Sequence, residues 1–83
     1  MPPMRIRIIL WNGNTFYATR RATIEEIEHV LRDHTSDFRR NLPNRRATHV
    51  AKGRTAAGRP LVVAFIYRAA DRSATPITAW EDR

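Results

Sequence analysis

A cluster of basic residues borders one turn of the chain. Lys52, the only lysine, lies close to Arg54 and Arg59 within the segment from Thr48 to Trp80. The apolar runs and turn residues of that segment predict three antiparallel strands, so the three cations would flank the first turn of a small sheet. Ammonium and guanidinium groups gathered in this way suit phosphate oxygens. The cluster therefore predicts phosphate binding, and the plain alternative is a set of solvated turn residues.

Few residues near this cluster could transfer a proton. Cleavage of RNA without a metal needs a base, an acid and cations around the phosphate. Alternation along a strand places His49 and Lys52 on opposite faces, so they would form a catalytic pair only if a bulge intervened. We take Lys52 and Arg54 as candidates for phosphate stabilisation during catalysis. The candidates for proton transfer are His49, Tyr67 and Glu81.

Further contacts to nucleic acid would come from residues outside this turn. Arg68 ends the second of the three strands, and Arg20 and Arg21 precede a predicted helix, where each could contact a phosphate. Trp80 could stack on a base, or it could pack against the core or a partner. No cluster of His, Asp and Glu has the spacing of metal ligands, so we expect neither a metal nor another cofactor.

The charge balance narrows the class of partner. The 83 residues include 15 Lys and Arg against 8 Asp and Glu, a net charge of +7, and no cysteine. Such an excess fits a nucleic acid or an acidic protein. The length predicts a single domain spanning residues 1–83. The sequence has neither an apolar run of membrane-spanning length nor a signal-peptide pattern, so a cytoplasmic location is expected.

The N-terminal half predicts a strand, a helix and a polar link. Alternation over residues 5–10 predicts a strand with Ile6, Ile8 and Leu10 facing inward, and residues 11–14 have the composition of a turn. A capping box formed by Thr23 and Glu26 predicts a helix from about residue 24 to about residue 34. The segment 37–46 is rich in arginine and has no apolar period, which indicates a solvated loop or an arm along a nucleic-acid backbone. The apolar stripe of the helix consists of Ile24, Ile27, Val30 and Leu31.

The C-terminal half predicts a three-stranded meander. Its strands would span residues 47–52, 61–67 and 74–80, joined by a hairpin at 53–59 and a turn at 69–73. The second strand is apolar on both faces, which indicates a central position in the sheet. Pro76 in the last strand indicates an edge position or a bulge. The whole pattern predicts an α+β fold with the element order β-α-β-β-β.

Several of these segments resemble the BrnT toxins, which are relatives of the RelE/ParE superfamily. The hairpin sequence GRTAAGRPLVV at residues 53–63 resembles that family's GRT-x-x-GR-x-L-x-V pattern in spacing. The helix sequence TIEEIEHVL at 23–31 is similar to the family's TPEEVEEVL. The residues ITA at 77–79 resemble its closing I-[ST]-A-R, and WN at 11–12 resembles its W-[DN] pair. The similarity covers most of the chain.

The resemblance implies both a fold and a function. The fold would be a small curved antiparallel sheet with a helix packed on one face and an active site on the exposed concave face. The function would be that of a bacterial type II toxin, a metal-independent endoribonuclease that cleaves mRNA and inhibits translation. A cognate antitoxin protein would neutralise it, and the assembly would be a homodimer or a toxin–antitoxin heterotetramer.

Departures from the family pattern leave other functions open. Trp80 stands where the family usually has an arginine, and Thr75-Pro76 where it usually has another basic residue. No counterpart of the family's C-terminal helix is expected after Trp80. These departures favour a catalytically degenerate member that acts as a protein- or nucleic-acid-binding module. A gyrase inhibitor of the ParE type and a bare nucleic-acid-binding domain are the remaining alternatives.

Overall fold

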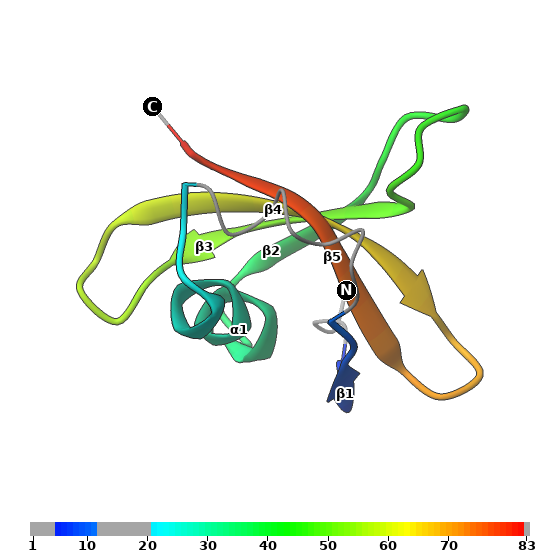
Figure 1. The fold of residues 1–83 in the computed structure, drawn as a ribbon, viewed down its shortest axis with the longest axis horizontal. Coiled ribbons are helices and arrows are strands. Elements are labelled where there is room, and N and C mark those ends of the chain that lie inside the picture. The colour runs from blue at the N-terminus through cyan, green and yellow to red at the C-terminus, as the bar shows by residue number, and fades with distance from the viewer. Residues whose placement is uncertain (1–4, 12–20, 83) are drawn as a thin grey trace.

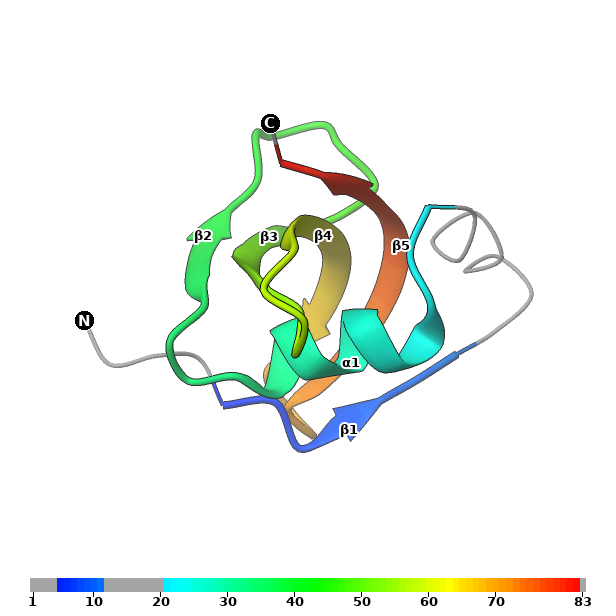
Figure 2. The ribbon, with the colours of Figure 1, turned by 90° about the vertical axis from the view of Figure 1, so that its left-hand side faces the viewer.

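A five-stranded sheet and one helix make up the part of the chain described by the computed structural model, residues 5–11 and 21–82. The elements are β1 (Ile8–Ile9), α1 (Ile24–Arg32), β2 (Asp37–Arg40), β3 (His49–Arg54), β4 (Pro60–Arg68) and β5 (Ser73–Glu81). The strand order is β1-β5-β4-β3-β2, and α1 lies against one face of the sheet (Figure 1). The sheet curves around α1 (Figure 2), which confirms the predicted α+β class and the packed helix.

The sheet is mixed, because β1 pairs with β5 in the parallel direction. The predicted order β-α-β-β-β also lacked β2, which pairs antiparallel with β3 and borders the sheet. The purely antiparallel sheet and the uninterrupted polar link at 37–46 were therefore wrong. Phe38 is the only apolar residue of β2, so no apolar alternation reveals this strand in the sequence. Its formation depends on backbone pairing with β3.

Helix α1 begins as the capping box predicts. The Glu26 N–H donates to Thr23 Oγ1 over 3.1 Å, and the Thr23 N–H donates to Glu26 Oε1 over 2.9 Å. Three residues of the predicted apolar stripe, Ile27, Val30 and Leu31, are buried, whereas the fourth, Ile24, is 44% exposed. As the first residue of the helix, Ile24 precedes the turn that contacts the sheet.

The helix ends at Arg32, slightly before the predicted end at His34. Asp33 adopts an extended conformation, and its Oδ1 atom accepts hydrogen bonds from both the N–H and the hydroxyl of Thr35. This local turn competes with another turn of helix, as short polar side chains commonly do. The chain then enters β2 after a short connection.

The face of the sheet toward α1, which we call the inner face, forms the core. Gly53 lies on this face of β3, where an added Cβ would lie 3.1 Å from Val30 Cγ1 and would overlap Ser36 Oγ. Glycine therefore allows β3 and α1 to approach closely. The buried core residues of β3, β4 and β5 on the inner face are Ala51, Leu61, Val63, Phe65, Ala74 and Ala79.

Strand β1 does not follow the predicted alternation. Ile8 and Leu10, both predicted to face inward, are exposed, whereas Ile9 packs against the core. The N–H groups of Arg7 and Ile8 both approach the Arg72 carbonyl oxygen, at 2.8 and 3.5 Å. Because two successive amides share one acceptor, the period of two is interrupted and the following side chains exchange faces.

Pro76 lies at a β-bulge, one of the two positions that the sequence indicated for it. Ala64 of β4 pairs with Thr78, but Phe65 pairs with Pro76, so Ile77 is an extra residue in β5. A bulge is one of the few places where a sheet tolerates proline. It also increases the local twist, which suits a sheet that curves around a helix.

The hairpin between β3 and β4 is closed by its own backbone and attached to the start of α1. The Thr55 N–H donates to the Arg59 carbonyl over 2.9 Å, and Gly58 has a φ of 87°, a conformation that favours glycine. Arg59 Nη2 donates to the Arg21 carbonyl over 3.0 Å and to Glu26 Oε1 over 3.1 Å. One carboxylate oxygen thus joins the helix cap to the hairpin.

Replacing Glu26 should therefore destabilise the fold more than replacing its neighbour. Glu26→Ala removes the capping acceptor and the ionic partner of Arg59, so we expect the free energy of unfolding to fall by about 1–2 kcal/mol. Glu25→Ala is the matched control, because Glu25 is an exposed residue of the same helical turn; it should change stability by less than about 0.5 kcal/mol. Urea unfolding measures the free energy of unfolding of both variants. An equal loss of stability in the two would contradict this role of Glu26.

Candidate nucleic-acid interface

The outer face of the sheet, which points away from α1, carries an aromatic and a basic side chain in one row. Backbone pairing aligns Lys52 of β3, Val62 of β4 and Trp80 of β5. Lys52 is exposed and Trp80 is 38% exposed, whereas Val62 between them is only 2% exposed. With about 4.8 Å between neighbouring strands, the Cα atoms of Lys52 and Trp80 lie roughly 10 Å apart. The row combines a surface for stacking with a cation.

Cations outnumber carboxylates around this row. Alternation places Arg39, Arg54 and Arg68 on the outer face of β2, β3 and β4. On these three strands, all within the described part of the chain, the outer face carries one carboxylate, Asp37. It lies opposite Lys52 in the register of β2 and β3, and its Oδ2 atom lies 2.9 Å from Arg39 Nε. The positive field of such a face attracts phosphates.

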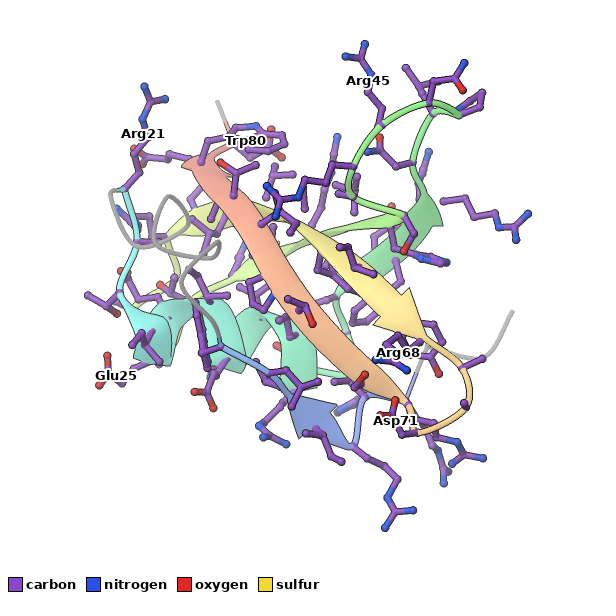
Figure 3. All side chains as sticks on the ribbon, turned by 45° about the vertical axis from the view of Figure 1, so that its right-hand side comes forward. Arg21, Glu25, Arg45, Arg68, Asp71 and Trp80 are labelled. Atoms are coloured by element: carbon purple, nitrogen blue, oxygen red, sulfur yellow. The ribbon has the colours of Figure 1, made fainter. Side chains whose placement is uncertain are left out.

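Basic side chains also border the outer face. Arg45 and Arg46 are exposed in the connection between β2 and β3, and Arg21 is exposed before α1. In Figure 3, Arg21, Trp80 and Arg45 all extend along the upper side of the view, and Arg68 lies near the turn between β4 and β5. In this view Arg21 and Arg45 lie on either side of Trp80.

The two hairpin arginines make contacts within the fold. Arg59 is partly buried and donates to the Arg21 carbonyl and to Glu26, which favours a structural role over contact with a phosphate. Arg54 Nη1 donates to the Gly58 carbonyl over 3.0 Å, but its side chain is exposed on the outer face. Arg20, another predicted phosphate contact, lies outside the described residues, as does the predicted turn after Trp11.

His49 and Tyr67 meet on the inner face. The His49 ring stacks on Phe65 with 5.9 Å between the centroids, and its centroid lies 5.6 Å from that of Tyr67 in an edge-on arrangement. Thr48 Oγ1 lies 2.8 Å from His49 Nδ1. Burial lowers the pKa of His49 below its ordinary value of 6.5, and the charge of Arg40, its cross-strand neighbour, lowers it further. A neutral imidazole of this kind can accept a proton near neutral pH.

The five catalytic candidates do not converge on one site. Glu81 is the last residue of β5, whereas the other four lie on β3 and β4. Lys52 and Arg54 belong to the outer face, whereas His49 and Tyr67 belong to the inner face, as strand alternation predicts for His49 and Lys52. The sheet separates the two pairs, so the cations of the outer face cannot stabilise a phosphate held beside the imidazole.

Two arginines of β2 belong to these surfaces but were not predicted as site residues from the sequence. Arg39 adds to the outer face, and Arg40 lies across from His49 on the inner face. Both had been assigned to a polar link. The available signal was the alternation of charge around Phe38, which would have required the strand itself to be recognised first.

Neither a metal site nor a membrane helix was found in the described residues. Within residues 5–11 and 21–82, no group of three or more His, Cys, Asp or Glu side chains is arranged to hold a metal ion. Helix α1 is neither long nor apolar enough to cross a membrane. Comparisons of the chain with family models, curated proteins and solved structures found no match.

The surroundings of His49 predict how it titrates. NMR titration should give its imidazole a pKa below 6.5, and Arg40→Ala should raise that pKa by removing a nearby positive charge. The folded state binds this proton less tightly than the unfolded chain, so stability should fall as the pH is lowered through the pKa. Arg39→Ala is the matched control, since Arg39 lies on the opposite face of β2. An equal effect of the two substitutions would contradict the assignment.

Proposed function

We propose that the protein binds single-stranded RNA on the outer face of its sheet. The observation that carries this proposal is the row of Lys52, Val62 and Trp80 on a sheet face that α1 does not cover. The net charge of +7 favours a polyanionic ligand. The choice of RNA follows the resemblance of the hairpin and helix sequences to the BrnT toxins.

The two ends of the row would contact different parts of the RNA. The exposed indole of Trp80 offers a stacking surface for a base, a contact worth about 1–3 kcal/mol. Lys52, with Arg39 and Arg54 beside it on the same face, would contact the phosphates. Bases within a duplex are already stacked on one another, so this mode of binding selects an unpaired strand.

Substitutions at the two ends of the row should weaken binding in different ways. We expect Trp80→Ala to weaken binding about tenfold without changing its salt dependence, because stacking carries no net charge. Lys52→Ala should weaken binding and also reduce the slope of log affinity against log salt by about 0.7, the value for one phosphate contact on a single strand. Fluorescence anisotropy with an end-labelled RNA oligonucleotide, repeated over a salt series, measures both quantities.

A charge on another surface provides the control. Arg32 is half exposed on α1, on the far side of the sheet from the row, and Arg32→Ala removes the same charge as Lys52→Ala. Its affinity for RNA should remain close to that of the unsubstituted protein. Equal losses for Arg32→Ala and Lys52→Ala would mean that only the overall charge matters, and the outer-face site would be wrong.

Metal-independent cleavage of RNA is a second candidate function. It is favoured by the contact between His49 and Tyr67, by the lowered pKa of His49 and by Arg40 nearby. In this proposal His49 would act as the base, Tyr67 would donate a proton to the leaving oxygen, and Arg40 would contact the phosphate. The protein would then be a toxin that stops translation, with an antitoxin as its inhibitor, as the resemblance implies.

Incubation of an end-labelled mRNA with the protein in excess EDTA tests this second function. We expect His49→Ala to slow cleavage at least about 100-fold, the usual contribution of a general base. His29→Ala is the control, because His29 is partly exposed on α1, where its Nε2 atom lies 3.9 Å from Asp33 Oδ2. Absence of cleavage by the unsubstituted protein would exclude this candidate function. The proposal of RNA binding would be unaffected, because the anisotropy measurement tests it separately.

A further inference from the structure

Strand β2 has no partner strand on its outward edge among the described residues, 5–11 and 21–82. It is the last strand of the sheet on its side, as Figure 2 shows. The Asn41 N–H, just after β2, donates to the carbonyl of Thr48, the residue before β3, over 2.9 Å. In an antiparallel ladder the bonding direction alternates, so Arg39 and Asp37 also direct their backbone groups toward β3, and Phe38 and Arg40 direct theirs outward. Free groups of this kind are a template for another strand.

We propose that two copies of this chain form a dimer by antiparallel pairing of β2 with β2, about a two-fold axis at Phe38. In this register Phe38 lies opposite the partner's Phe38, Asp37 lies opposite the partner's Arg39, and Arg39 lies opposite the partner's Asp37. The two outward-facing Phe38 residues would exchange both of their backbone hydrogen bonds. The two sheets would become one continuous sheet, with their outer faces on the same side.

Charge complementarity selects this register from its neighbours. An axis at Arg39 or Arg40 would place an arginine opposite its own copy, and an axis at Asp37 would do the same with a carboxylate. Like charges directly opposite each other destabilise a sheet. An axis at Ser36 lies outside β2, so every residue of β2 would face a residue that precedes the partner's β2. Among the axes within β2, only the one at Phe38 places opposite charges across the interface.

The side chains concerned are available for these contacts. Asp37 and Arg39 are both largely exposed, and their 2.9 Å contact along the strand shows that the two groups can meet on the outer face. Phe38 is only partly buried on the inner face, where it meets Phe65 edge-on with 6.3 Å between centroids. Pairing would cover the remaining surface of Phe38 with that of the partner's Phe38, whose Cα would lie about 5.5 Å away.

The dimer can be tested by exchanging charges between two variants. Asp37→Arg gives a chain with arginine at both charged positions of β2, and Arg39→Asp gives a chain with aspartate at both. Each variant alone should be monomeric at concentrations where the unsubstituted protein dimerises, because like charges then face each other. An equimolar mixture of the two should dimerise again, because every pair across the interface is then of opposite charge.

Analytical ultracentrifugation over a concentration series gives the oligomeric state of each sample. Arg72→Asp, in the turn before β5, makes the same change in net charge as Arg39→Asp away from the β2 edge and should leave the dimer intact. Thermal unfolding of each variant shows that it remains folded. Restored dimerisation in the mixture cannot come from the ion pair within one strand, since each variant has lost that pair.

Two results would overturn the proposal. One is that the unsubstituted protein is monomeric at every concentration. The partner of the β2 edge would then be a strand of a different, acidic protein. The other is a mixture that stays monomeric while each variant is folded. No RNA is present in these measurements, so their outcome is independent of the proposed function.

A cross-link tests the register itself. The chain has no cysteine, so Phe38→Cys introduces a single thiol on the proposed axis. The Cα separation of about 5.5 Å expected there is within the range of a disulfide. Mild oxidation should convert the variant to a covalent dimer faster than Lys52→Cys, whose thiol lies on β3, the neighbouring strand inside the sheet. Equal rates for the two variants would contradict the axis at Phe38.

Discussion

The carboxylate of Glu26 is the contact on which the arrangement of the helix and the hairpin depends. Its Oε1 atom accepts from the Thr23 N–H at the start of α1 and from Arg59 Nη2 of the hairpin. The same nitrogen of Arg59 also donates to the Arg21 carbonyl, so the backbone just before α1 is attached to the hairpin as well. In a chain without cysteine, no disulfide can join these elements. The position of the hairpin in turn sets the ends of β3 and β4, and with them the row that contains Lys52.

Local signals in the sequence were sufficient for some elements and not for others. The capping box and the hairpin with Gly58 depend on residues close together in the chain, and both were predicted. For Pro76 the sequence left an edge position and a bulge open, and the structure has the bulge. Strand β2 has one apolar residue, and its formation depends on a partner strand that follows a long connection. The faces of β1 were misassigned because two amides share the Arg72 carbonyl, a contact with a residue at the far end of the chain.

Some residues of the candidate site could likewise be placed from the sequence, and others could not. Strand alternation was enough to separate His49 from Lys52, because the rule requires only that β3 be regular. It could not show that Arg59 is engaged by Glu26, since that contact joins residues distant in sequence. Nor could it place Arg40 beside His49, because the strand that carries Arg40 was not recognised. A basic residue at a turn has the same appearance in a sequence whether it holds the fold together or faces a ligand.

The order of the strands has a consequence for how the protein is made. The central strand β4 is flanked by β3 and by β5, and β5 is also the neighbour of β1. A chain that lacks β5 would leave one edge of the apolar strand β4 unpaired. The surface of Leu61, Val63 and Phe65 is fully buried only when β5 is in place. Incomplete chains would therefore expose an apolar strand edge, the kind of surface that aggregates or recruits chaperones.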